Sequence, residues 1–214
     1  MAISGVLRIA LGLALAATAL FGPTATAAPA ASGWACTVPP GQTYTAVRSS
    51  SSCTPQYYVD TPTDASRACS VPSGFTYITV QSASACSLTG VAPQYFLRVP
   101  QDAMYTCTVP PGFSYLSVKS TTSCVTSGVG PQYFIRVPQD SMRTCTLPPG
   151  FTYLSVALST TCATSGSAPE YFIKTPQDRM WACTVPPGWT YIGTRQANGC
   201  VTSGTAVQYF IARP

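Results

Sequence analysis

The sequence contains no histidine, and only 8% of its residues are charged. Histidine is the commonest general base and a frequent zinc ligand, so most familiar nucleophile–base pairs and zinc sites cannot be built here. Cysteine is the other frequent zinc ligand, but no two cysteines have the C-x-x-C spacing. We therefore expect a protein that is not an enzyme and that uses neither a metal ion nor a cofactor.

A long apolar run is also missing after the first thirty residues, although a membrane-spanning helix needs about 20 apolar residues. At the start of the chain, the single charge of Arg8 precedes an apolar stretch at 9–21, and two A-x-A motifs follow at 25–27 and 28–30. This order predicts a secretory signal peptide at 1–30, with a retained membrane anchor as the alternative. We expect a secreted, extracellular protein that does not stay inserted in a membrane after cleavage.

Clusters of positive charge are absent as well. Without Arg8 the chain has ten basic and six acidic residues, a net charge of +4, and the basic residues occur singly. Proteins that bind nucleic acid usually carry a basic run or stripe, so we expect no nucleic-acid partner. A weak attraction to anionic cell-wall polymers is compatible with this charge.

What the sequence does have is an internal repeat of about 38 residues, which the cysteines mark. The two cysteines of each pair are 17 positions apart, at 36 and 53, 69 and 86, 107 and 124, 145 and 162, and 183 and 200. Successive pairs start 33, 38, 38 and 38 positions apart, because repeat 1 lacks five residues after Cys53. The predicted units are repeat 1 (31–66), repeat 2 (67–104), repeat 3 (105–142), repeat 4 (143–180) and repeat 5 (181–214).

An even number of cysteines in an exported chain predicts a disulfide framework. The simplest pairing closes each repeat on itself, and pairing between neighbouring repeats is the alternative. The predicted disulfides are Cys36–Cys53, Cys69–Cys86, Cys107–Cys124, Cys145–Cys162 and Cys183–Cys200. A unit of this size is below the roughly 40 residues at which small folds need such support, so each disulfide should be necessary for its repeat.

Within one repeat the pattern predicts three short strands and no helix. In repeat 3 these are 105–109, 113–118 and 132–137, with a Pro110-Pro111-Gly112 turn between the first two. Such a turn splays the strands that it joins, so the first two strands should meet at a corner. We predict an all-β protein with short antiparallel strands, built as an elongated stack of repeats; a closed ring of five small sheets is the alternative.

Some places keep one residue type in all or nearly all repeats, which indicates a structural role. Two of them are tyrosines, predicted as core, at 44, 77, 115, 153 and 191 and at 57, 95, 133, 171 and 209. Another is the linker aspartate at 64, 102, 140 and 178. Asp102 lies four residues after Arg98, as Asp140 does after Arg136, so we expect a turn cap or a local ion pair.

Other places vary between aromatic and basic residues, which indicates exposure. The residue two before the first cysteine is Trp34, Arg67, Tyr105, Arg143 and Trp181, and the sixth residue after it includes Phe113, Phe151 and Trp189. Exposed aromatic rings beside arginines suit stacking on sugar rings or contact with a protein surface, although packing between repeats would also explain them. The candidate ligand-binding residues are Trp34, Tyr105, Trp181, Phe113, Phe151, Trp189, Arg98 and Arg136.

These observations favour a non-catalytic secreted repeat protein that binds an extracellular or cell-surface polysaccharide or protein through several repeats at once. The alternative is a secreted protease inhibitor or a cationic antimicrobial or competition protein. The Cys107-Thr-Val-Pro-Pro segment is similar to part of the loop of Bowman–Birk inhibitors, but it lacks the residue to be cleaved and the serine before the prolines.

Overall fold

A computed structural model describes residues 32–214, and the predicted signal peptide at 1–30 lies outside them. The described chain folds into five sheets, each of three antiparallel strands, which confirms the predicted all-β class. Each sheet is formed within one predicted repeat, except that β7 and β13 begin one residue earlier, at Met104 and Met180.

Each repeat contributes its three strands in the same order. The first strands are β1 (Gly33–Ala35), β4 (Arg67–Ala68), β7 (Met104–Thr106), β10 (Arg143–Thr144) and β13 (Met180–Ala182). The second strands are β2 (Thr43–Arg48), β5 (Thr76–Ala83), β8 (Ser114–Thr121), β11 (Thr152–Ser159) and β14 (Thr190–Ala197). The third strands are β3 (Gln56–Asp60), β6 (Ala92–Arg98), β9 (Gly130–Arg136), β12 (Ala168–Lys174) and β15 (Ala206–Ala212). Short 3-10 turns follow three of the second strands, at η1 (Ser84–Cys86), η2 (Thr160–Cys162) and η3 (Asn198–Cys200).

The third strand lies in the middle of every sheet, as in the order β7-β9-β8 of repeat 3. The first two strands do not pair, because the Pro-Pro-Gly turn carries the chain to the far edge of the sheet. A β-bulge in β8 between Tyr115 and Ser117 recurs at the same place in the other second strands. The third strand carries apolar side chains on both of its faces: Ile135 is buried on one, and Phe134 packs against Tyr105 on the other.

All five disulfides close within a repeat, which is the pairing that the equal spacing favours. Each joins the residue after the first strand to the loop between the second and third strands. No cysteine of the described chain is left free. Five such bonds suit an oxidising, extracellular environment.

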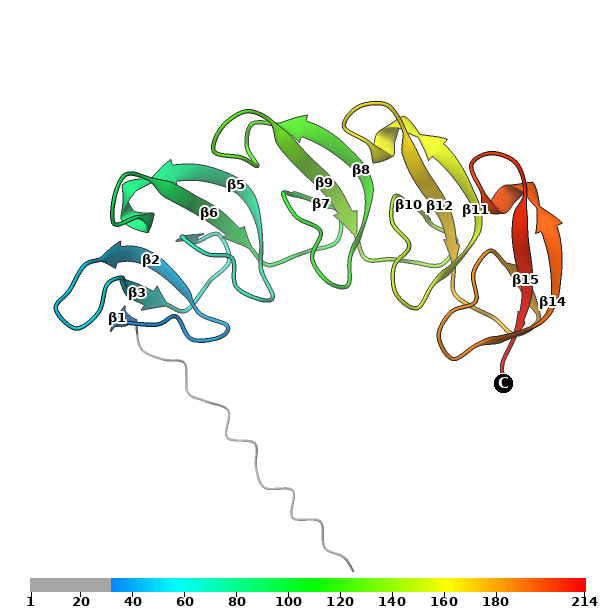
Figure 1. The fold of residues 1–214 in the computed structure, drawn as a ribbon, viewed down its shortest axis with the longest axis horizontal. Coiled ribbons are helices and arrows are strands. Elements are labelled where there is room, and N and C mark those ends of the chain that lie inside the picture. The colour runs from blue at the N-terminus through cyan, green and yellow to red at the C-terminus, as the bar shows by residue number, and fades with distance from the viewer. Residues whose placement is uncertain (1–31) are drawn as a thin grey trace, which may run out of the picture.

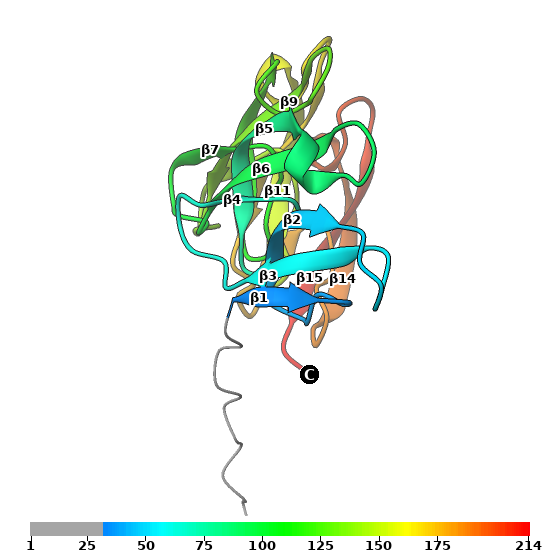
Figure 2. The same cartoon turned by 90° about the vertical axis from the view of Figure 1, so that its left-hand side faces the viewer.

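The repeats follow one another in an open, curved array, with repeat 1 at one end and repeat 5 at the other (Figure 1). The predicted elongated stack is therefore confirmed, and the ring is not formed. The turns between first and second strands lie along the concave edge of the arc, and the loops between second and third strands lie along its convex edge (Figure 1). In the end-on view of Figure 2, the strands of repeat 1 are nearly horizontal, whereas those of repeats 4 and 5 are nearly vertical. Strand direction therefore rotates along the array.

Neighbouring repeats are joined by the same two polar contacts at every junction. The backbone N–H of each first cysteine donates to a tyrosine carbonyl of the preceding repeat, as from Cys145 to Tyr115 at 2.8 Å. Beside it, a buried hydroxyl at the start of the second strand meets a hydroxyl of the next repeat, as Ser114 meets Thr146 at 2.7 Å. The equivalent hydroxyl pairs are Thr43–Ser70, Thr76–Thr108 and Thr152–Thr184.

The apolar core of each repeat is small. One aliphatic side chain of the central strand is fully buried in each of repeats 2 to 5, at Leu97, Ile135, Ile173 and Ile211, and Val59 takes this place in repeat 1. Both cysteines of repeats 2 to 5 are buried as well. So little apolar area cannot hold 38 residues alone, and the disulfide and the neighbouring repeats supply the rest. Among residues 32–214, no helix is long and apolar enough to cross a membrane.

Candidate ligand-binding surfaces

The structure separates the eight predicted ligand-binding residues into three places. Trp34, Tyr105 and Trp181 lie on one face of their sheets, in the first strands. The second group, Phe113, Phe151 and Trp189, follows the Pro-Pro-Gly turns along the concave edge. Arg98 and Arg136 form ion pairs at the ends of the third strands.

Two aromatic residues of the first strands, Trp34 and Tyr105, are exposed, whereas Trp181, predicted as exposed, is half-buried; none of the three rings is free. Trp34 is 37% exposed and Tyr105 is 45% exposed. The Arg48 guanidinium carbon lies 4.0 Å from the centroid of the Trp34 ring, and the Lys119 nitrogen lies 4.3 Å from that of Tyr105. A third-strand ring packs against each from within the sheet, as Phe134 does against Tyr105 at 5.0 Å between centroids. A sugar could stack on these rings only after displacing the cation.

Repeats 2 and 4 exchange the two roles. Arg67 and Arg143 take the place of the aromatic residue, and each guanidinium lies over a third-strand ring, Phe96 at 5.8 Å and Phe172 at 5.9 Å. Each repeat therefore has one cation resting on an aromatic ring on the same face of its sheet. We call the five cations Arg48, Arg67, Lys119, Arg143 and Arg195, with the rings beneath them, the cation face.

Sequence reasoning missed the cations of repeats 1, 3 and 5. Arg48, Lys119 and Arg195 stand twelve residues after the first cysteine, where repeats 2 and 4 have Gln81 and Ala157. This place in the repeat therefore does not carry a cation in every unit. Where the second strand lacks a cation, the first strand supplies one, and the two places come together on one face only in the folded sheet.

Two members of the second group, Phe113 and Phe151, line an apolar hollow that recurs along the concave edge. Between repeats 3 and 4 it is lined by Phe113, Val137, Pro138, Pro148, Pro149 and Phe151. Between repeats 2 and 3 the same six places are Phe75, Val99, Pro100, Pro110, Pro111 and Phe113. Phe113, Phe151 and Trp189, predicted as exposed, are all half-buried. Neighbouring repeats pack around Phe113 and Phe151. We call these hollows the proline grooves.

The expected local ion pair between Arg98 and Asp102 is wrong. The Nε of Arg98 donates to Asp64 at 2.9 Å, and that of Arg136 donates to Asp102 at 2.8 Å, each across 34 residues. The same carboxylate accepts the N–H that follows the cation, as Asp102 does from Val137 at 2.8 Å. Each linker aspartate thus belongs to the repeat that follows it and closes the end of that repeat's central strand.

These contacts perturb the linker carboxylates. The Arg136 side chain and the Val137 N–H lower the pKa of Asp102, and the same pair of contacts, led by the Val99 N–H, lowers the pKa of Asp64. Lys174 and the Thr175 N–H lower the pKa of Asp140 to about 2. Lowered pKa values keep these groups ionised, as a structural clamp requires.

The tyrosines form a continuous row rather than a closed core. Two tyrosines of one repeat meet edge to face, as Tyr115 and Tyr133 do at 5.0 Å between centroids. The hydroxyl of Tyr171 in the next repeat also influences the pKa of Tyr115. Partial burial, followed by these neighbouring hydroxyls, raises the pKa of Tyr115. The pKa values of Tyr44, Tyr77 and Tyr153 are raised for the same reasons.

Within residues 32–214, no three histidine, cysteine, aspartate or glutamate residues gather as metal ligands would. No protein-family model, curated protein or solved structure matches the chain. The surfaces described above are therefore the features that bear on the function.

Proposed function

We propose that this protein is a secreted, non-catalytic repeat protein that binds an extended extracellular ligand, a polysaccharide or a protein surface, through several repeats at once. The observation that carries the proposal is the recurrence of the same surface features at successive places along an open array. A ligand that spans several repeats gains avidity from contacts that are weak one by one.

The proline grooves are the best candidate for apolar contact with such a ligand. They offer the faces of Phe75, Phe113 and Phe151 beside rigid prolines, and Val99 and Val137 at their margins are more than 40% exposed. Rings held in place by neighbouring prolines lose little conformational entropy on binding, which favours stacking on a sugar or contact with an apolar side chain.

The test is co-sedimentation of the oxidised chain with insoluble peptidoglycan, chitin and cellulose, at low and at high salt. Retention at high salt would support apolar stacking, whereas loss of binding on adding salt would indicate charge attraction. The variant Phe113→Ser/Phe151→Ser should weaken salt-resistant binding. A control, Val91→Ser/Val129→Ser, removes two exposed apolar side chains outside the grooves and should bind normally. Absence of binding to all three polymers would contradict the polysaccharide form of the proposal.

A further inference from the structure

Every sheet presents one exposed cation on the cation face, although the cation comes from different strands. In repeats 1, 3 and 5 the cation lies in the second half of the second strand, and in repeats 2 and 4 it lies in the first strand. The register places Trp34 opposite Tyr58 and Arg67 opposite Phe96, so the two arrangements use the same face of the sheet. A cation is thus kept once per repeat even where its place in the sequence changes.

Carboxylates neutralise fewer of the cations on the cation face than of the cations at the ends of the third strands. Arg98, Arg136 and Lys174 are each paired with a linker aspartate. In contrast, four of the five cations on the cation face have no ion pair within the described residues, 32–214. Only Arg143 has one, with Glu170 at 3.2 Å, and Glu170 stands where the other repeats have glutamine.

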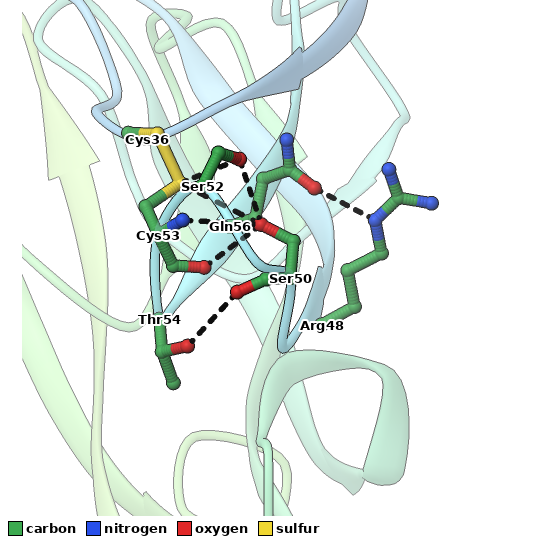
Figure 3. The surroundings of a disulfide bond; sticks show 7 residues. All are labelled: Cys36, Arg48, Ser50, Ser52, Cys53, Thr54 and Gln56. Carbon is green, nitrogen blue, oxygen red and sulfur yellow. Dashed lines mark hydrogen bonds between the residues drawn. A yellow bond between two sulfur atoms is a disulfide. The ribbon is translucent and has the colours of Figure 1, made fainter.

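Two of these arginines are also held in place with their outer nitrogens available. The Nε of Arg48 donates to the Gln56 side chain at 2.8 Å, and that of Arg195 donates to Gln208 at 2.7 Å. In Figure 3 the two terminal nitrogens of Arg48 point away from the residues drawn around it. A guanidinium fixed by a ring and an amide keeps its planar fork for a carboxylate or phosphate, with little further entropy to lose.

We propose that the cation face binds a linear acidic polysaccharide along the array, with an acidic group of the polymer at each cation. This inference depends on the proposed multivalent function and names the ligand class. Nucleic acid fits less well, because a duplex carries one charge per roughly 1.7 Å and its partners carry dense basic patches, whereas this face offers one cation per repeat. The rings beneath the cations hold these charges in place, so that each cation can meet an acidic group of the polymer without leaving its ring.

The experiment measures the affinity of the full oxidised chain for soluble polygalacturonate, a carboxylate polymer, at low salt. The double variant Arg67→Gln/Lys119→Gln removes two cations of the face. Its control, Arg179→Gln/Arg213→Gln, removes the same charge elsewhere. We expect roughly a tenfold loss for the first, since an exposed charge contact contributes up to about a factor of five, and less than a twofold loss for the control.

A gain of binding is a second readout. Glu170→Gln frees Arg143 and makes repeat 4 like its neighbours, so it should strengthen binding about two- to fivefold. Asp60→Asn makes the same change in net charge at a carboxylate that forms no ion pair with a cation of this face, and it should have a smaller effect. Circular dichroism spectra and melting temperatures of the variants show whether each is folded.

Three results would overturn the inference. They are equal losses for the two double variants, an equal effect of Glu170→Gln and Asp60→Asn, and tighter binding of a single-stranded DNA oligonucleotide than of polygalacturonate. If the chain fails here but binds a neutral glycan through the proline grooves, the proposed function stands and only the acidic ligand class is lost. If it binds neither kind of polymer, the acidic ligand class and the polysaccharide form of the proposed function are both contradicted.

Discussion

The linker aspartates show how single residues set the geometry of this array. Asp64, Asp102 and Asp140 each accept hydrogen bonds from a basic side chain and from a backbone N–H at the end of the next central strand. Asp178 accepts the Arg213 N–H, and Ala212 stands in the place of the basic residue. The residue after each aspartate has a positive φ, at Ala65, Ala103, Ser141 and Arg179. The backbone N–H of Ala103 then donates to the Ile135 carbonyl at 3.1 Å, so the left-handed turn serves the same closure.

The first prediction concerns acid. The pKa of Asp140 is about 2 in the folded protein against a usual value of 3.8, and those of Asp64 and Asp102 are also lowered. A lowered folded pKa adds stability above the unfolded value that disappears as the pH falls through the folded value. The melting temperature should therefore fall between about pH 4 and pH 2. The variant Asp64→Asn/Asp102→Asn/Asp140→Asn should be less stable at pH 6 and lose much of this dependence; an unchanged dependence would contradict the clamp.

The second prediction concerns the left-handed turn. Ala103 has φ +62°, a conformation that costs an L residue about 1 kcal/mol and costs glycine little. Ala103→Gly should therefore leave the stability unchanged or raise it by up to about 1 kcal/mol, measured by urea unfolding. The same exchange at Ala92 in β6, where the backbone is extended, should lower it by about 0.5–1 kcal/mol. Equal losses at both sites would show that the turn carries no strain.

At the scale of the element, each three-stranded sheet depends on its disulfide, but the five are not equally protected. Both cysteines are buried in repeats 2 to 5, whereas Cys36 is exposed and Cys53 is half-buried. No described residue covers repeat 1 on the side where the other repeats have a predecessor. Its shortened loop is held by hydrogen bonds between Ser50 and Cys53 (Figure 3).

The third prediction follows from this exposure. A mild thiol reductant should open Cys36–Cys53 before the other four disulfides, because a thiolate must reach the sulfur atom that it attacks. Alkylation of the new thiols and peptide mass spectrometry give the order. Random or simultaneous opening would contradict it. Replacement of the central pair, Cys107→Ser/Cys124→Ser, should cost roughly 3 kcal/mol for a loop of this length.

The fourth prediction concerns the tyrosine row. Burial and neighbouring hydroxyls raise the pKa values of Tyr44, Tyr77, Tyr115 and Tyr153 above the usual 10.0. A raised folded pKa adds stability that is present below the unfolded pKa and is lost as the pH rises through the folded one. The array should thus lose stability above about pH 10. Phenolate absorbance should titrate later in the folded protein than in urea, and coincident titrations would exclude the effect.

At the scale of the whole molecule, the two ends of the array differ. In later repeats, the loop after the second cysteine lies against the tyrosines of the preceding repeat. At the junction of repeats 2 and 3 this loop consists of 124–127, and repeat 1 lacks it. In repeat 5, Tyr191 and Ile192 are 53% and 63% exposed, because no described residue covers the face that receives a successor elsewhere. Stability should therefore depend on position along the array, as in other repeat proteins.

The fifth prediction tests this dependence with one substitution at two equivalent places. Thr152→Val removes a buried hydroxyl that meets Thr184 at 2.8 Å, and it should cost about 1–2 kcal/mol. Thr190 occupies the same place in repeat 5 but is exposed, so Thr190→Val should change the stability by less than about 0.5 kcal/mol. Urea unfolding measures both. Similar costs would mean that the junction hydroxyls add little.

The repeat and the three strands per unit could be predicted from the sequence, and the pairing of the cysteines within a repeat was favoured, because these features depend on spacing and on local chemistry. The equal 17-residue separation implied Cys107–Cys124 and its equivalents. The irregular residues of repeats 1 and 5 also predicted an open array, since terminal repeats have only one neighbour.

Which strands and side chains become neighbours could be learned only from the tertiary structure. Which strand is central, that Asp102 pairs with Arg136 rather than Arg98, and that Arg48 covers Trp34 all depend on register across the sheet. Long-range pairing is set by the packing of the small core around Ile135 and its equivalents, which no local pattern encodes. The cation face exists only in that register, because two places twelve or more residues apart exchange their roles between repeats while the face that they share stays the same.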